Sequence, residues 1–212
     1  MKKIIIINYG CGNILSLKRA LREIGYESSL SNSKDEILSA DFVILPGVGA
    51  FENAIKLLNK YKLIETIKDY ADLKKPLLGI CLGRQILFSK GFEMGSHSGL
   101  NFIEGKVDKI TKEQNNKKIK IPHINWSNLF FVNENSKFNF NKNLSGRSFY
   151  FVHSYMAFLK NENDLVAYCK YYDIKVPAIV KSDNVIGFQF HPEKSGKNGL
   201  EILKNTIEEA YV

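Results

Sequence analysis

Residues 1–90 alternate between two hydrophobic patterns, short continuous apolar runs and amphipathic stretches with helical spacing. The continuous runs predict strands that are buried on both faces, and they lie at 3–8, 41–45 and 76–80. The amphipathic stretches predict helices, and they lie at 14–24, 50–61, 63–73 and 82–88. Alternation of this kind predicts an α/β fold, an open and mostly parallel sheet flanked by helices.

The pattern changes after Gly91, where short strand-like segments alternate with polar turns. They lie at 99–110, 118–121, 147–155, 165–171, 177–181 and 185–190, and a helical pattern at 195–210 closes the chain. A polar, asparagine-rich stretch at 133–143 predicts a loop. Because no Pro-, Gly- or Ser-rich linker interrupts the chain, we expect a single domain over 1–212, with the β-rich second half extending the sheet.

Composition narrows the class of protein. The 212 residues are 44% hydrophobic and 25% charged, ordinary values for a globular chain that can bury a sizeable core. The early isoleucine run is too short for a membrane span or a secretory signal. The three cysteines are too few and too scattered for a disulfide framework. Without a CxxC motif or a histidine at ligand spacing, we expect no metal site. We therefore expect a reduced, cytoplasmic protein with no membrane association.

The formal net charge of +8 raises nucleic-acid binding as an alternative. Only four of the 30 basic residues are arginines, the side chains most used for base and phosphate recognition. The densest basic stretch, 106–120, also contains Asp108 and Glu113 and has no interleaved aromatic residues. We interpret it as a solvated hairpin and expect no nucleic-acid partner.

Cys81 is the first candidate for chemistry. It stands where the predicted strand at 76–80 runs directly into a predicted helix, between Gly79 and Gly83. A strand–turn–helix corner flanked by small residues is typical of a nucleophile elbow, which exposes its central side chain at the carboxyl edge of the sheet. The helix start favours a thiolate there, and the backbone N–H of Leu82 would face an oxyanion. The alternative is a buried cysteine among glycines needed only for packing.

His191 and Glu193 are the second candidate. They follow the predicted strand at 185–190, and side chains two residues apart in an extended chain point the same way. A carboxylate beside an imidazole fixes its tautomer and stabilises the imidazolium. The alternative is a histidine at a strand end with a solvated glutamate. Because both candidates end strands of one open sheet, we expect them to meet at its carboxyl edge.

Six segments of the chain resemble motifs of the class I, or triad, glutamine amidotransferases. GICLGRQ at 79–85 and QFHPEKS at 189–195 are similar to motifs shared across class I. A narrower resemblance, to the glutaminase subunits of imidazole glycerol phosphate synthases, rests on YGCGN at 9–13, PGVGAF at 46–51, PHINW at 122–126 and YFVHSY at 150–155.

The resemblance implies an enzyme that hydrolyses L-glutamine to glutamate and ammonia through a cysteine thioester, without a cofactor. The implied catalytic residues are Cys81 as nucleophile, His191 as base and Glu193 as its orienting group. The implied oxyanion hole is the backbone of Leu82 with that of Val48 or Gly49, and the implied substrate-binding residues are Gln85, His153, Ser154 and Tyr155. Gln85 is alternatively a structural polar residue of the helix start, and His153 is not expected to be the base.

The resemblance also implies a partner. Ammonia would pass to a (β/α)8 synthase subunit that makes imidazole glycerol phosphate and AICAR in histidine biosynthesis, the two subunits forming a heterodimer. The implied interface residues are Tyr9, Asn13, Asn125 and Trp126. Tryptophan is favoured at interface hot spots, although a core aromatic is the alternative for Trp126.

Three residues depart from the motifs: Asn8 replaces Asp, Arg84 replaces Met and Asn125 replaces Gly. They lie near the implied site mouth and partner face, so a related glutaminase that feeds an amino- or amidino-sugar synthase stays open. A stand-alone γ-glutamyl hydrolase of the same superfamily is a further alternative. A non-catalytic binding protein on this fold is disfavoured because all three triad residues are present.

Overall fold

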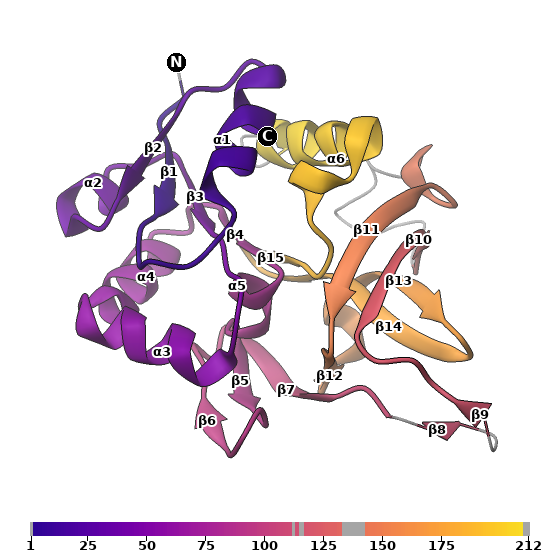
Figure 1. Ribbon diagram of the computed structural model, residues 1–212. Helices are drawn as coiled ribbons and strands as arrows, with labels where there is room; N and C mark the ends of the chain where they lie inside the picture. The colour runs from indigo at the N-terminus through magenta and orange to yellow at the C-terminus, as the bar shows by residue number, and fades with distance from the viewer. Residues whose placement is uncertain (1, 112, 115–116, 133–142, 210–212) are drawn as a thin grey trace.

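A computed structural model of the chain describes residues 2–111, 113–114, 117–132 and 143–209 (Figure 1). The strands of its main sheet are β1 (Ile4–Ile7), β2 (Ser28–Ser31), β3 (Phe42–Leu45), β4 (Leu77–Ile80), β10 (His123–Phe131), β11 (Ser148–His153), β13 (Leu165–Tyr171), β14 (Ile174–Ser182) and β15 (Val185–Phe188). Their spatial order is β11-β10-β13-β14-β15-β4-β3-β1-β2. Strands β2, β1, β3, β4 and β15 are parallel, and the remaining pairs are antiparallel. The predicted α/β sheet, extended by the β-rich second half, is confirmed.

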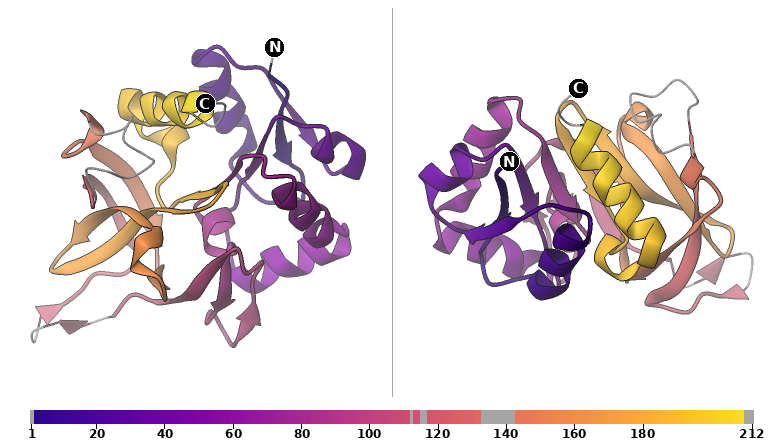
Figure 2. Two further views of the ribbon diagram at one scale, coloured as in Figure 1. Left: turned by 180° about the vertical axis from the view of Figure 1, so that it is seen from behind. Right: turned by 90° about the horizontal axis from the view of Figure 1, so that it is seen from above.

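The helices are α1 (Ile14–Glu23), α2 (Lys34–Leu38), α3 (Phe51–Lys60), α4 (Leu63–Asp72), α5 (Leu82–Gln85) and α6 (Gly196–Glu209), with short 3-10 turns η2 (Glu162–Asp164) and η3 (Pro192–Lys194). A smaller sheet has the order β12 (Tyr155–Leu159), β7 (Ile103–Lys109), β5 (Phe88–Gly91) and β6 (His97–Ser98). Strands β8 (Glu113–Gln114) and β9 (Lys117–Lys118) form a separate hairpin. Figure 2 shows the same arrangement from behind and from above.

The main sheet has a hydrophobic core on each face. In β1, Ile4 and Ile6 pack with α1 and α6 on one face, while Ile5 and Ile7 pack with α2, α3 and α4 on the other. Side chains of a strand alternate between faces, so a strand covered on both sides needs apolar residues at every position. The continuous isoleucine run is therefore explained by helices on both sides, each buried side chain contributing roughly 1.5–3 kcal/mol.

Besides β6, β8 and most of β12, two short elements and one long strand were not predicted from the pattern. Strand β2 and helix α2 have few apolar residues, and β10 alternates exposed and buried positions within a motif we interpreted only chemically. The predicted helix at 82–88 is too long: α5 ends at Gln85, and Phe88 begins β5, which pairs with β7. Pairing with a strand distant in sequence overrides the local helical pattern there. The predicted loop at 133–143 lies almost entirely outside the described residues.

Candidate active site

Cys81 lies at a sharp corner between β4 and α5. Its backbone has φ 55° and ψ −109°, a conformation that residues with a side chain rarely adopt. A hydrogen bond of 2.7 Å from the Cys81 N–H to the Phe188 carbonyl anchors the corner to β15. A Cβ at Gly83 would overlap the Leu45 carbonyl, so α5 approaches the end of β3 as closely as only glycine allows. The geometry is that of a nucleophile elbow.

His191 and Glu193 lie beside this corner because β15 is the parallel neighbour of β4. The His191 Nδ1 atom is 2.8 Å from Glu193 Oε1, and both side chains are almost completely buried. Asn13 donates a further hydrogen bond of 3.4 Å from Nδ2 to the same carboxylate oxygen. The expected extended conformation is wrong for Glu193, which lies in the 3-10 turn η3 that follows His191. The turn, and not strand alternation, brings the carboxylate to the imidazole.

The His191 imidazole is held in its charged form. Burial alone would lower its pKa, but hydrogen bonds with Cys81 and Glu193, and the charges of those two groups, outweigh burial and raise the pKa above its usual value. Nδ1 is occupied by Glu193, which leaves Nε2 for the sulfur. A protonated imidazole next to a thiol favours the thiolate, the nucleophilic form.

A pocket of about 310 Å³ opens in front of Cys81. It is lined by Val48, Gly49, Cys81, Leu82, Gln85, Glu93, Val152, His153, Ser154, Tyr155, His191 and Lys194. The structure thus brings together the residues predicted for the nucleophile, base, oxyanion hole and substrate contacts, while Glu193 lies behind His191. The volume of the pocket is in the range of small-molecule binding sites.

The backbone around Leu82 can hold a negatively charged oxygen. Leu82 is the first residue of α5, and the first N–H groups of a helix have no acceptor within it. Val48 and Gly49 line the same pocket from the loop after β3, where Gly49 has φ 101°. These backbone segments converge beside Cys81, as an oxyanion hole requires.

Gln85 makes hydrogen bonds within the protein and also lines the pocket. Its Nε2 donates to the Tyr155 carbonyl at 3.1 Å and to Gln189 Oε1 at 3.2 Å. Both amide hydrogens are thereby used. The carboxamide oxygen is the atom through which Gln85 can accept a hydrogen bond from a ligand.

His153 belongs to a buried chain of polar groups. Its Nδ1 is 2.9 Å from the Tyr155 carbonyl, which can only accept, so Nδ1 carries the proton. His153 Nε2 then accepts from His123 Nδ1 at 3.0 Å, and His123 Nε2 accepts from the Ser127 hydroxyl at 2.9 Å. Both ring nitrogens of His153 are bonded within the protein, so only its backbone is available to a substrate.

The sequence reasoning missed two charged residues of the pocket, Glu93 and Lys194. Glu93 follows β5, whose first residue falls in the predicted helix, and its carboxylate accepts a hydrogen bond of 2.7 Å from the Phe51 N–H. Lys194 lies directly after Glu193 in the motif at 189–195. Lys194 could have been predicted from its position within this motif, whereas no motif near Glu93 indicated that it lines the pocket.

The predicted interface residues differ in exposure. Tyr9 is completely buried and donates a hydrogen bond of 2.6 Å from its hydroxyl to the Pro46 carbonyl, so its predicted position at a partner surface is wrong. It supports the loop after β3 instead. Asn13 is half-buried and bonded to Glu193. Asn125 is exposed on β10, and Trp126 is 50% exposed beside Tyr150, not in the core.

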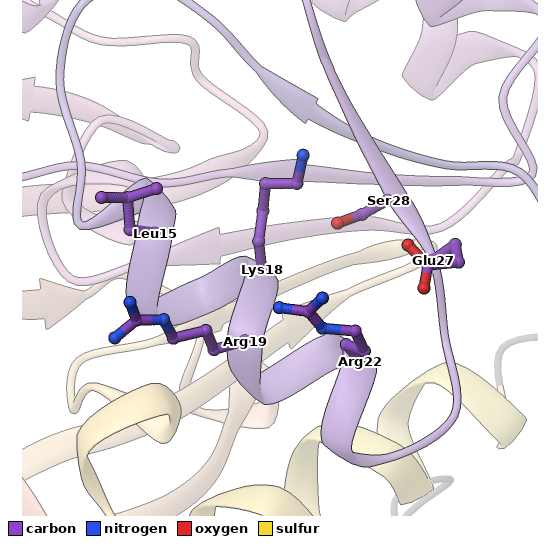
Figure 3. A pocket seen from close by; sticks show the side chains of 6 residues that line it. All are labelled: Leu15, Lys18, Arg19, Arg22, Glu27 and Ser28. Carbon is purple, nitrogen blue, oxygen red and sulfur yellow. The ribbon is translucent and has the colours of Figure 1, made fainter.

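A second pocket, of about 340 Å³, lies on the outer side of α1 (Figure 3). Lys18, Arg19 and Arg22 line it from one side of the helix, and Glu27 and Ser28 complete the lining together with Leu15. It contains no cysteine or histidine, so despite its volume it offers no covalent chemistry of the kind built around Cys81. Part of the excess positive charge lies here.

The other thiols differ from Cys81. Burial raises the pKa of the Cys169 thiol to about 12, and burial also raises the pKa of Cys11. Neither is poised to react as a thiolate at neutral pH. Within the described parts of the chain, no group of three metal-binding side chains is present, and no helix is both long and apolar enough to span a membrane.

Comparisons with known proteins identify relatives of the whole chain. The family model described as "Glutamine amidotransferase class-I" matches residues 5–210. The chain is 44% identical over 210 residues to a Lactococcus lactis protein named imidazole glycerol phosphate synthase subunit HisH, covering 99% of this chain and 100% of that protein. The protein of the same name from Carboxydothermus hydrogenoformans is 43% identical, with 96% and 98% covered.

Solved structures share the fold at lower identity. PurLQS from Thermotoga maritima is similar with a TM-score of 0.72 at 21% identity, covering 98% of this chain and 99% of that one. A protein described as a glutamine amidotransferase, also from Thermotoga maritima, is similar with a TM-score of 0.60 at 18% identity, covering 98% and 81%.

The buried histidine chain predicts a pH dependence of stability. Burial lowers the pKa of His123 to about 4, and burial together with the neighbouring His123 lowers that of His153 to about 3. Below about pH 6.5 the unfolded chain binds protons that the folded chain does not. The free energy of unfolding should therefore fall with decreasing pH, by up to about 1.4 kcal/mol per pH unit for each histidine.

Urea unfolding between pH 6.5 and 5 measures this slope. His191 adds little in that window, because its raised pKa leaves it protonated in the folded state and its ordinary pKa leaves it mostly protonated in the unfolded state. We expect His123→Asn to reduce the slope by about half, since one of the two depressed groups is removed. If the slope for His123→Asn equals that of the wild type, the conclusion that His123 and His153 stay neutral in the folded protein is contradicted.

Proposed function

The chain belongs to the class I glutamine amidotransferase family, and from this premise we propose that it is the glutaminase subunit of an imidazole glycerol phosphate synthase. It hydrolyses L-glutamine to glutamate and ammonia for histidine biosynthesis. The observation that carries the proposal is the convergence of Cys81, His191 and the oxyanion-type backbone on one pocket, in a chain similar over its full length to proteins of that name.

The reaction begins with the thiol proton of Cys81 already on His191, whose imidazole is held in its charged form. The thiolate sulfur attacks the side-chain amide carbon of glutamine, forming a C–S bond. Glu193 holds the imidazolium through the 2.8 Å hydrogen bond to Nδ1. When the tetrahedral intermediate collapses, the C–N bond breaks and His191 returns the proton to the departing nitrogen, which leaves as ammonia.

The oxyanion of this intermediate would be held by backbone N–H groups of Leu82 and of Val48 or Gly49, which line the pocket beside the sulfur. The thioester left on Cys81 is then hydrolysed. Water, activated by His191, adds to the same carbon and passes through a second oxyanion. The C–S bond breaks, and glutamate and the free thiol are released.

Glu93 and the backbone of β11 and β12 would bind the amino-acid end of glutamine. The carboxylate of Glu93 is the acidic group of the pocket lining and suits the α-ammonium group. The 153–155 backbone lines the same pocket, where N–H groups can meet the α-carboxylate. The Gln85 carboxamide oxygen can accept from the substrate amide.

We further propose that Asn125 and Trp126 contact the (β/α)8 synthase subunit. Ammonia is useful only if it reaches its acceptor before protonation and loss, so the glutaminase needs a docked partner. Ile124, Asn125 and Trp126 are consecutive exposed residues of β10, and Ile124 and Trp126 are 56% and 50% exposed. An exposed tryptophan near an exposed isoleucine is the composition of a binding surface.

The nucleophile is tested by substitution. Cys81→Ser should lower glutaminase kcat by at least about a thousandfold, because the motif works through a covalent thioester. Cys11→Ser is the matched control and should retain activity, since Cys11 does not line the pocket. Glutamine hydrolysis is measured as glutamate release. Activity that survives in Cys81→Ser and not in Cys11→Ser would refute the assignment.

Glu93 is tested by removing its charge. Glu93→Gln keeps the shape of the side chain but loses the attraction for the α-ammonium, so we expect KM for glutamine to rise by about 10- to 100-fold with kcat less affected. Glu52→Gln, in the exposed ion pair of α3, is the control. An unchanged KM in Glu93→Gln would show that the ammonium binds elsewhere.

The partner is tested by reconstitution. We expect low turnover from the chain alone and at least about tenfold more when the synthase subunit is present with its acceptor ligand, because uncoupled ammonia release is wasteful. Trp126→Ala should weaken subunit binding, by about 2 kcal/mol if Trp126 is a hot spot, and leave basal turnover intact. High turnover without a partner, together with activity on γ-glutamyl peptides, would favour a stand-alone γ-glutamyl hydrolase.

A further inference from the structure

Arg84 is a completely buried arginine without a carboxylate partner among the described residues. It lies in α5, three residues after Cys81, and its side chain crosses β15 where Gly187 leaves room for it. The guanidinium packs 5.2 Å from the centre of the Phe88 ring. Removing a charge from water without an opposite charge has a large free-energy cost. An apolar side chain would fill this part of the core without the cost of burying a charge. The arginine at this position therefore needs a reason other than packing.

The guanidinium clamps Gln189. Arg84 Nη1 donates to Gln189 Oε1 at 2.9 Å, and Nη2 donates to the Pro177 carbonyl at 3.0 Å. The Gln189 oxygen also accepts from Gln85 Nε2 at 3.2 Å. Two donors on one atom settle which end of this carboxamide is oxygen. Its NH₂ end must then point the other way.

That NH₂ end points at the nucleophile. Gln189 Nε2 lies 3.9 Å from Cys81 Sγ, within reach of a weak N–H···S hydrogen bond, and Gln189 is completely buried. Arg84 thus acts on the sulfur in two ways: through an N–H donor whose direction it fixes, and through a positive charge buried away from solvent. Both favour a thiolate over a thiol.

Among the described residues, His191, from the segment after β15, and Tyr9, from the turn after β1, interact with the sulfur from inside the protein. Glu93, Tyr155 and Lys194 line the pocket on its open side. Burial, followed by the neighbouring Cys11 and Cys81 thiols, raises the pKa of Tyr9, which therefore stays neutral. Arg84 itself faces Cys81, Cys169 and His153. Cys169 and His153 remain neutral, so Arg84 and His191 are the buried cations beside the Cys81 sulfur among the described residues, whereas Lys194 lines the pocket in front of it.

We propose that Arg84 is a positioning residue of the nucleophile, clamping Gln189 so that an amide N–H and a buried positive charge together hold Cys81 as a reactive thiolate. The proposal rests on Cys81 being the nucleophile of the proposed glutaminase. It adds a second cationic support behind the sulfur, independent of the His191–Glu193 pair. Arg84 does not line the pocket, so it acts through Gln189 and not on the substrate.

The test measures the thiolate directly. Alkylation of Cys81 by iodoacetamide is followed from pH 5 to 9 in the full chain, with the modified peptide identified by mass spectrometry. Arg84→Met, similar in length but uncharged, should raise the apparent pKa of Cys81 alkylation by about one unit or more and slow alkylation at pH 7 about tenfold. Glutaminase kcat should fall with KM unchanged. Arg147→Met, at an exposed ion pair, is the matched control and should alkylate as the wild type does.

Two further variants separate positioning from packing. Arg84→Lys keeps a charge but cannot span both Gln189 and Pro177, so it should restore part of the alkylation rate. Gln189→Glu keeps an acceptor for Arg84 and replaces the N–H at the sulfur by an anion, so it should raise the alkylation pKa even though the fold is retained. If circular dichroism shows that Arg84→Met does not fold, the alkylation profile of Gln189→Glu tests the proposal in its place.

Alkylation profiles in Gln189→Glu and in folded Arg84→Met that equal the wild type would overturn the proposal and leave Arg84 a packing residue. A wild-type chain without glutaminase activity even when the synthase subunit and its acceptor ligand are present, but with the alkylation shift in Arg84→Met, would instead refute the proposed function and support the positioning role. The two failures are therefore distinguishable.

Discussion

The parallel pairing of β4 with β15 is the interaction on which the site depends. The two strands lie far apart in the sequence, yet Phe188 pairs with Ile80 and the Cys81 N–H is bonded to the Phe188 carbonyl at 2.7 Å. Carboxyl ends of neighbouring parallel strands meet at one sheet edge. This pairing therefore sets the elbow cysteine beside the residues that follow β15, and Gln189 and His191 reach the sulfur from the same short segment.

The protonation state of each buried side chain in this region depends on its hydrogen-bond partners. His191 is bonded to a carboxylate and is held as a cation, whereas His153 is bonded to a carbonyl and to a second neutral imidazole and is held neutral. Arg84 meets an amide oxygen and a carbonyl, so its charge is not cancelled locally. The proposed nucleophile, Cys81, therefore lies beside two cationic side chains, and neutral side chains lie beneath the 153–155 backbone. An anionic sulfur and an anionic intermediate both benefit from this arrangement.

The sequence was sufficient for features that have a local cause. Continuous isoleucines report a strand covered on both faces, and glycines around Cys81 report a close turn, because each follows from sterics within a few residues. Features with a distant cause were missed. Phe88 is a strand residue because β7 pairs with it, Tyr9 is buried because Pro46 accepts its hydroxyl, and Glu93 enters the pocket only through the path of β5. The 3-10 turn at Glu193 shows that the contact between His191 and Glu193 was predicted for an incorrect geometric reason.

The most direct test of the account is covalent labelling with a glutamine analogue that carries a diazoketone in place of the side-chain amide. Such a compound enters a glutamine pocket and alkylates the nucleophile positioned at the amide carbon. Peptide mapping by mass spectrometry should find one adduct, on Cys81, and excess glutamine should prevent it. An adduct on Cys11 or Cys169, or labelling of Cys81 that glutamine does not slow, would contradict a glutamine site built around the elbow.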